Sequence, residues 1–253
     1  MRRVLLAALL ALAACGRAPE PPRVTAEVRQ PAAASAPPRP MQPASAPASA
    51  PRVTEVETED LPVSRDRGAP LVDVRTVDPT IRVELKYATA DNFTGTPLPG
   101  YVGRHALLRP AAAQALARAQ AALRAEGVGL LVYDAYRPVR ASRAMVEWAR
   151  RTGHLDLVRR GYVAVRSRHN LGVAVDLTLC DLASGRPLDL GTAYDAFSTK
   201  VHTANATGAA LANRRRLAAA MTAAGFAPYD KEWWHFAYDR DAGATERYDV
   251  DVP

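Results

Sequence analysis

Residues 167–179, SRHNLGVAVDLTL, limit what this chain can fold into more than any other segment. From residue 172 onward its side chains alternate in character, which is typical of a β-strand with two different faces. One face carries only aliphatic side chains: Val173, Val175, Leu177 and Leu179. The other face carries Asp176, and His169 lies seven residues before it. We interpret the segment as a half-buried strand that presents a carboxylate on its second face.

A carboxylate inside an apolar strand needs a partner, because an unpaired buried charge is costly. A metal ion shared with His169 would supply that partner for Asp176. A satisfied core histidine and a surface aspartate would explain the same residues without any metal. This segment alone leaves both interpretations open.

The segment EWWHF, residues 232–236, adds two further groups. His235 would complete a ligand set of His169, Asp176 and His235 with one open position, which is the pattern of catalytic rather than structural zinc. Glu232 is then available as the base that takes a proton from the attacking water. An odd spacing on a regular strand separates two side chains onto opposite faces, so we expect Glu232 in the turn before the strand. The alternatives are that Glu232 is a solvent-exposed acid and that His235 fills an aromatic cluster.

Hydrophobic periodicity and capping residues place the other elements. The expected strands are residues 81–87, 128–133 and 233–238. The first of them is expected to have one solvent-exposed face. The expected helices are residues 110–127, 139–151 and 209–224, the last closed by Gly225. The polar segment 180–205 is too long for a hairpin turn, and we expect it to fold over the site. This mixture predicts an α+β fold with a mainly antiparallel central sheet and helices packed on it.

The first fifteen residues, MRRVLLAALLALAAC, have the pattern of a secretory signal: arginines, an apolar run and a small-residue site. The run is too short to be a permanent membrane span. It ends in LAAC, which resembles a bacterial lipobox, so we expect residues 1–15 to be a lipoprotein signal and Cys15 to be lipidated. An ordinary signal peptide is the alternative. The expected location is the periplasm, with Cys15 as the only membrane anchor and the choice of inner or outer membrane open.

Residues 16–64 are rich in Ala, Pro and Ser and lack apolar periodicity, which predicts a disordered tether ahead of one domain at 65–253. A lipidated Cys15 leaves Cys180 without a disulfide partner, so we expect Cys180 to be a small buried residue. The net charge of +7 could suggest nucleic acid as a partner. We exclude it, because the sequence has no block of basic residues and no basic helix with interleaved aromatics.

SRHNLGVAVDLTL followed by EWWHF resembles the signature of the zinc peptidases that cleave D-alanyl-D-alanine, which share their fold with hedgehog and lysostaphin-type enzymes. Three further motifs, YATADNFTG, YDAYRP and LGTAYDAF, most resemble the VanX-type D-alanyl-D-alanine dipeptidases. The resemblance covers residues 71–240 and excludes the lipobox and tether. It implies a hedgehog-like fold and zinc-dependent hydrolysis of the small D,D-dipeptide, in cell-wall peptide metabolism or glycopeptide resistance.

The same resemblance implies roles for particular residues. It implies one Zn²⁺ per chain on His169, Asp176 and His235, with Glu232 as general base and then acid. Arg137, in YDAYRP, corresponds to the arginine that stabilises the tetrahedral intermediate. The alternative for Arg137 is a surface arginine that the nearby Asp134 holds in a bidentate pair.

Two substrate-binding residues also follow from the resemblance. Asp195, in YDAF, corresponds to the acid that receives the ammonium group of the dipeptide, and Ser167 corresponds to a residue beside the substrate. Tyr194 stands where we expect Phe, a departure that we interpret as lying outside the chemistry. His105 and His154 are interpreted as surface or helix-end residues, and the role of His202 stays open.

Two other functions fit much of the pattern. A related D,D-carboxypeptidase or peptidoglycan endopeptidase would act on longer wall peptides, but an amine-binding acid at Asp195 restricts an enzyme to short substrates. A non-catalytic wall-binding lipoprotein would be expected to have lost Glu232 or Arg137, and both are present. The sequence leaves the biological role and the oligomeric state open.

Overall fold

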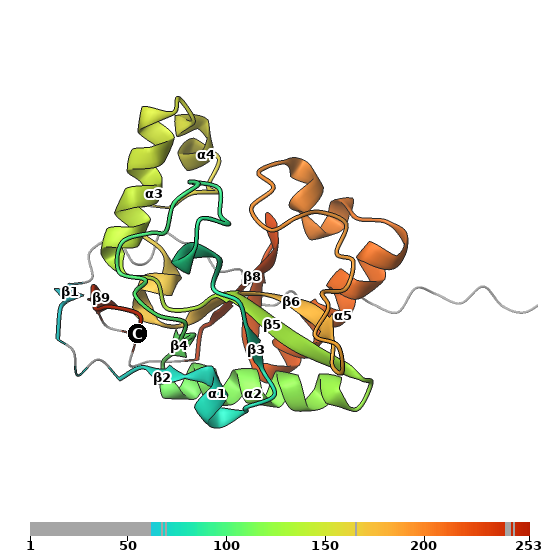
Figure 1. Ribbon diagram of the computed structural model, residues 1–253. Coiled ribbons are helices and arrows are strands. Elements are labelled where there is room, and N and C mark those ends of the chain that lie inside the picture. Colours follow the sequence, from blue (N-terminus) through green and yellow to red (C-terminus); the bar gives the residue numbers. More distant parts are fainter. Residues whose placement is uncertain (1–61, 67, 69, 165, 241–243, 245) are drawn as a thin grey trace, which may run out of the picture. The chain divides into compact units, whose positions relative to one another are not determined.

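The fold is built on a five-stranded sheet with the strand order β3-β5-β6-β8-β7. The computed structural model describes residues 62–66, 68, 70–164, 166–240, 244 and 246–253. The strands of the sheet are β3 (Arg82–Val83), β5 (Val128–Asp134), β6 (Ala174–Asp181), β7 (Phe226–Tyr229) and β8 (Glu232–Tyr238). Only the β3–β5 pair is parallel, and the other three pairs are antiparallel (Figure 1). Together with the helices, this confirms the predicted α+β class with a mainly antiparallel sheet.

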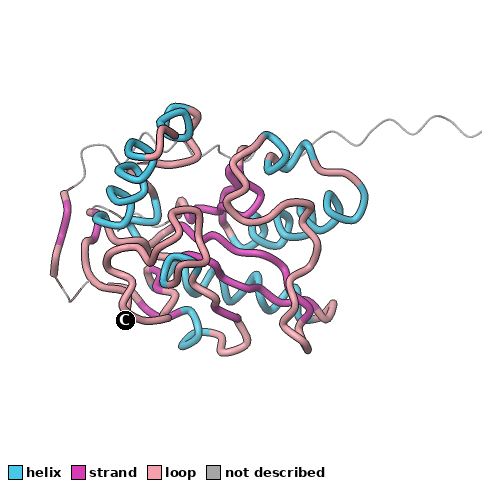
Figure 2. The backbone as a smooth tube through the Cα atoms, turned by 45° about the horizontal axis from the view of Figure 1, so that its top comes forward, coloured by secondary structure: helices cyan, strands magenta, loops and turns pink. Residues whose placement is uncertain are grey.

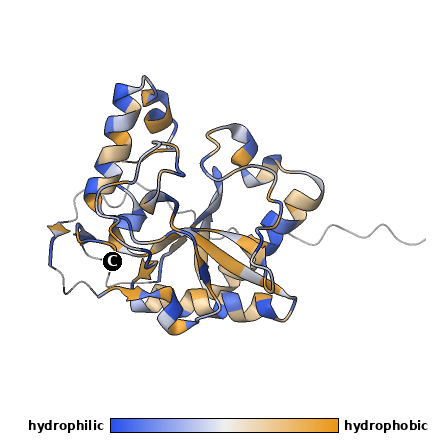
Figure 3. Cartoon of the chain, in the orientation of Figure 1, coloured by the Kyte–Doolittle hydropathy of each residue, from blue (hydrophilic) through white to orange (hydrophobic). Residues whose placement is uncertain are grey.

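β6 occupies the middle of the sheet and is buried on both faces, apart from its last residue. Its aliphatic side chains join the main core together with residues of α2 (Pro110–Arg124) and α5 (Gly208–Ala224). The opposite face carries Cys180, which clusters with Leu131 and Tyr133 of β5 beneath Tyr194. Apart from its last residue the strand is therefore buried and not half-buried, and Tyr194 of the following segment packs against its second face. Figure 3 shows the hydrophobic character of these central strands.

The predicted helices form close to their expected positions. α2 begins at Pro110, which suits the first helical turn, and α5 is capped after Ala224 by Gly225, whose φ of 104° is the left-handed conformation that glycine adopts readily. The helix predicted over 139–151 is α3 (Val139–Arg151). The remaining helices are α1 (Val74–Val77) and α4 (Leu155–Arg159), with 3₁₀ turns at Lys86–Ala88, Arg168–Leu171, Thr199–Val201 and Thr203–Asn205. Long loops connect several of these elements (Figure 2).

The strand expected over residues 81–87 is much shorter than predicted. Ile81, Leu85 and Tyr87 are buried as the alternation requires, but only Arg82–Val83 pairs with β5. After Leu85 the chain leaves the sheet edge in the 3₁₀ turn at Lys86–Ala88, which carries the buried Tyr87. The sequence thus predicts the burial of these three side chains, but a short strand and a 3₁₀ turn produce it in place of one long strand.

Two small sheets complete the described chain: β2 (Val72–Asp73) with β4 (Leu107–Leu108), and β1 (Val63–Ser64) with β9 (Arg247–Tyr248). The two residues of β1 were expected at the end of the tether. Because β1 pairs with β9, the folded part begins before residue 65. The predicted signal peptide with Cys15, and the tether up to residue 61, lie outside the described residues. None of the described helices is both long and apolar enough to cross a bilayer.

Candidate metal centre

His169 lies in a short 3₁₀ turn, Arg168–Leu171, directly before β6. The Ser167 hydroxyl accepts a hydrogen bond from the His169 amide at 3.3 Å, and the Asn170 side chain accepts one from the Ser167 amide at 3.1 Å. Gly172 ends the turn at φ 70°, and a Cβ there would lie 2.4 Å from a methyl group of Leu71. The sequence SRHNLG is thus a capped turn followed by a glycine that no other residue could replace without strain.

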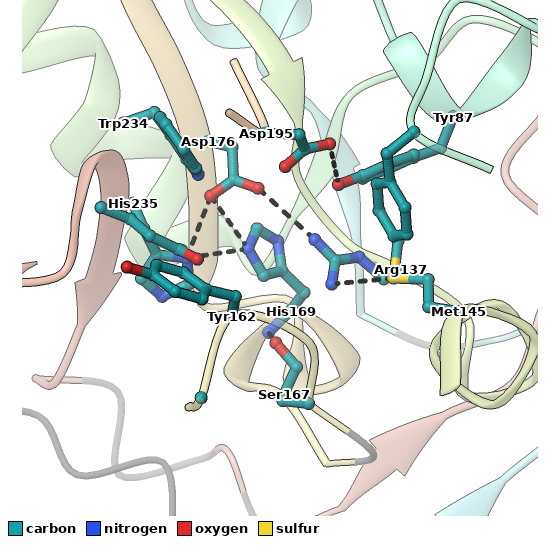
Figure 4. Close-up of a pocket in the computed structure, with 14 residues that line it drawn as sticks. Tyr87, Arg137, Met145, Tyr162, Ser167, His169, Asp176, Asp195, Trp234 and His235 are labelled. Carbon is teal, nitrogen blue, oxygen red and sulfur yellow. Dashed lines mark hydrogen bonds and ion pairs between the residues drawn. The ribbon is translucent and has the colours of Figure 1, made fainter. Parts of the chain in front are cut away.

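Asp176 and His235 lie opposite each other on the adjacent strands β6 and β8. Oδ1 of Asp176 is 2.9 Å from Nδ1 of His235 and 3.2 Å from Nε2 of His169, and the two ring nitrogens are 3.1 Å apart. All three side chains are buried. The structure therefore brings the three predicted ligands together, and Figure 4 shows them meeting at one point.

The arrangement fits a metal ion in both spacing and chemistry. A tetrahedral zinc with bonds of about 2.0–2.1 Å has ligand atoms about 3.3 Å apart, close to the three separations seen here. Nδ1 of His169 donates to the carbonyl of Ala135 at 2.5 Å, which leaves Nε2 as the ring nitrogen that faces the cluster. Burial alone would raise the pKa of Asp176, but the neighbouring His169 and His235 hold that pKa well below its ordinary value. The carboxyl group of Asp176 is thus held in its ionised form, which is the form that binds a metal.

Glu232 lines the same pocket and is 9% exposed, but it does not lie in a turn as expected. It is the first residue of β8, paired with Tyr229. The β7–β8 register shifts at this point, because Pro228 pairs with Phe236 and Tyr229 already pairs with Glu232. Three residues of β8 therefore have no partner on β7, and such a bulge re-aims side chains. This irregularity allows Glu232 and His235 to share a pocket despite their odd spacing.

Arg137 is a pocket residue held by two carboxylates. Its Nε donates to Oδ2 of Asp134 at 2.8 Å, and its Nη2 lies 2.8 Å from the same oxygen and 3.4 Å from Oδ2 of Asp176. Asp134 is fully buried and also accepts the Tyr101 hydroxyl at 2.6 Å. The pairing with Asp134 was expected, but Arg137 is only 7% exposed and lines the pocket. It is therefore not a surface arginine.

Asp195 forms another part of the pocket wall, with the Tyr87 hydroxyl donating to its Oδ2 at 2.9 Å. Burial and the charge of Asp176 raise the pKa of Asp195 to about 8. Its φ of 55° makes it the one non-glycine residue with a left-handed backbone among those the structure describes. The segment predicted to fold over the site, residues 180–205, thus presents the carboxyl group of Asp195 to it (Figure 4).

Arg214 of α5 holds the backbone of residues 190–202, which include Asp195, by hydrogen bonds. Arg214 is 2% exposed, and its guanidinium donates to four carbonyl oxygens, those of Leu190, Lys200, Val201 and His202. The arginine thereby ties together both ends of the stretch that contains Asp195. Nε2 of His202 lies 3.0 Å from the hydroxyl of Tyr162, another pocket residue, so His202 joins this stretch to the pocket wall and is not part of the ligand cluster.

Tyr194 corrects one sequence interpretation. Its hydroxyl donates to Oδ2 of Asp176 at 2.8 Å and lies 3.0 Å from the Tyr87 hydroxyl. The presence of Tyr in place of the expected Phe was interpreted as lying outside the chemistry. The Tyr194 hydroxyl nevertheless contacts a candidate metal ligand. Tyr87 itself was missed, because the sequence assigned it to a strand. Its place in the motif YATADNFTG was the available signal.

Comparisons with known proteins place the chain in a family. The family described as D-ala-D-ala dipeptidase matches residues 67–252. The chain is similar to a D-alanyl-D-alanine dipeptidase of Streptomyces coelicolor, with 36% identity over 187 residues that cover 68% of this chain and 93% of the relative. It is 34% identical to a D-alanyl-D-alanine dipeptidase of Enterococcus faecium, over 68% of this chain and 93% of the relative. It is 39% identical to one of Escherichia coli over 66% of this chain and 83% of the relative.

Proposed function

The chain belongs to the D-ala-D-ala dipeptidase family, and from this premise we propose that its pocket hydrolyses D-alanyl-D-alanine to two molecules of D-alanine as a metallopeptidase. One observation carries the proposal. The three candidate ligands share a single buried pocket with an additional carboxylate, a fixed guanidinium and a carboxyl group of raised pKa.

We assign the metal as one Zn²⁺ per chain, held by His169, Asp176 and His235. Two imidazole nitrogens and one carboxylate oxygen suit zinc, and a three-ligand set leaves a position open for catalysis. When bound, zinc supplies Lewis acidity that polarises a carbonyl and acidifies water.

The remaining groups have roles that follow from their chemistry. Glu232, a pocket carboxylate outside the ligand set, accepts a proton from the attacking water and returns it to the leaving amine. Arg137 donates to the oxyanion that develops on the scissile carbonyl, and Asp134 holds its guanidinium in place beforehand. A donor fixed in advance needs no reorganisation during the reaction.

Asp195 receives the ammonium group of the dipeptide. Burial and the charge of Asp176 raise the pKa of this carboxyl group to about 8, so without substrate it keeps its proton at neutral pH. An arriving ammonium supplies the opposite charge, which lowers the pKa and allows an ion pair to form. Ser167 lines the pocket next to His169, and its helix cap uses only the hydroxyl oxygen, so its proton can be donated to the substrate.

Glu232→Gln tests the catalytic assignment. The amide is nearly isosteric but cannot accept a proton, so we expect a folded protein with wild-type zinc content and a kcat lowered roughly 100- to 10,000-fold. Glu147→Gln, which removes a half-exposed carboxylate on α3, is the matched control and should leave kcat unchanged. A near-normal kcat for Glu232→Gln would transfer the base role to another residue.

We also propose that the protein is a periplasmic lipoprotein, on the strength of the LAAC sequence ending at Cys15. Cys15→Ser should move the full chain from the membrane fraction to the soluble fraction, because acyl chains supply the anchor. Cys180→Ser, which changes a buried thiol, should leave the protein in the membrane fraction. Membrane association of Cys15→Ser at the wild-type level would contradict the proposal.

A further inference from the structure

We propose that Tyr194 is a positioning residue for the metal ligand Asp176 and that its hydroxyl strengthens zinc binding. The inference rests on the proposed metal site and concerns how this chain orients one of its ligands. The observation behind it is the 2.8 Å hydrogen bond from the Tyr194 hydroxyl to Oδ2 of Asp176.

The two oxygens of Asp176 have separate environments. Oδ1 faces the ring nitrogens of His235 and His169 at 2.9 and 3.2 Å, so it is the oxygen available to a metal. Oδ2 points away from the histidines, toward Tyr194 and Arg137. A carboxylate cannot donate, so the phenol proton is directed at Oδ2. Rotation of the carboxylate about its last bond would break this hydrogen bond and withdraw Oδ1 from the cluster.

Tyr194 is the stronger of the two partners of Oδ2. The Arg137 contact is longer, at 3.4 Å, and that guanidinium makes two 2.8 Å contacts with Asp134. In the proposed reaction Arg137 also donates to the substrate from its fixed position, whereas Tyr194 is not among the residues that line the pocket of the candidate ligands. The hydroxyl of Tyr194 is therefore the closer partner of Oδ2 and the one that has no role in the proposed reaction; its other contact is the Tyr87 hydroxyl at 3.0 Å.

The Tyr194 ring is held firmly enough to orient another group. It packs against Tyr133 and Trp234, with ring centres 5.1 and 5.2 Å away. The backbone on either side is tied down by Arg214 through the carbonyls of Leu190 and Val201. A ligand carboxylate that receives a hydrogen bond from such a fixed group loses less freedom on binding a metal. Partners of this kind typically contribute 10- to 100-fold to metal affinity or activity.

The test compares the zinc dissociation constants of purified full-length variants by competition with a chelator. Tyr194→Phe keeps the ring and its packing and removes only the hydroxyl, and we expect its zinc affinity to fall about tenfold. Tyr87→Phe is the matched control, because its hydroxyl contacts Tyr194 and Asp195 but has no hydrogen bond to Asp176. Its zinc affinity should stay within about twofold of wild type.

Two results would overturn the inference: wild-type zinc affinity in Tyr194→Phe, or an equal loss in Tyr87→Phe. Asp176→Ala separates this inference from the proposed metal site. If Asp176→Ala loses zinc and Tyr194→Phe does not, the metal site stands and the role of Tyr194 fails. If Asp176→Ala binds zinc as tightly as wild type, the metal site itself is wrong, and the inference fails with it.

Discussion

Asp176 and His235 face each other across the β6–β8 pairing, with Oδ1 of the carboxylate 2.9 Å from Nδ1 of the imidazole. Two of the three candidate ligands are thus fixed by the register of two buried central strands. The third, His169, is supplied by a capped turn at the start of β6. Sites built on strands and a rigid turn hold their geometry more accurately than sites on loops.

Zinc content tests this ligand set. We expect about one zinc per wild-type chain, and much less than half of that in His169→Ala and in His235→Ala, because two remaining ligands bind weakly. His105→Ala, which changes a half-exposed histidine beside Asp73, should keep full zinc content. Zinc at a thousand times its dissociation constant should also stabilise the wild type by about 4 kcal/mol. Full metal content in both ligand variants would place the site elsewhere.

The sequence was sufficient to predict the three candidate metal ligands, whereas Glu232 was expected in a turn and lies on β8. Asp176 stands out as a carboxylate inside an aliphatic alternation, and a buried charge limits the possible partners. The α2, α3 and α5 helices follow from proline, glycine and apolar spacing, which act locally. The interactions that define these features lie within a few residues of each other.

The features that could not be predicted depend on tertiary contacts. The β7–β8 register shift, which lets Glu232 and His235 share a pocket, depends on how two strands pair. Arg214 looks like one of three consecutive helix-surface arginines in the sequence, yet it is buried and donates to four carbonyls of a distant loop. The hydrogen bond between Tyr194 and Asp176 likewise joins residues of a loop and a strand that only the fold brings together.

The raised pKa of Asp195 predicts a specific dependence of stability on pH. The unfolded chain loses this proton near pH 3.8, whereas the folded protein retains it until about pH 8, so folding takes up a proton between these values. The free energy of unfolding of zinc-free protein should therefore fall as pH rises through this range. The slope that Asp195 contributes is at most about 1.4 kcal/mol per pH unit.

Denaturant unfolding of zinc-free wild type and Asp195→Asn at pH 5 and pH 7 isolates this contribution. Asn cannot ionise and tolerates the left-handed backbone at this position. Between the two pH values the wild type should lose up to about 3 kcal/mol more than the variant. Equal losses in the two proteins would show that Asp195 titrates near its ordinary value.

The central claim is that the enzyme is built for a free dipeptide, and substrate length tests it most directly. The measurement is kcat/KM of the wild type for D-alanyl-D-alanine, its N-acetylated analogue and a wall pentapeptide. An N-acetylated or extended substrate has no ammonium group to pair with Asp195, so we expect the free dipeptide to be preferred roughly 100- to 1,000-fold. Asp195→Ala should narrow this preference, whereas Asp91→Ala, which removes an exposed acid paired with Lys86, should preserve it. Cleavage of the pentapeptide by the wild type as fast as the dipeptide would contradict the account and identify a carboxypeptidase instead.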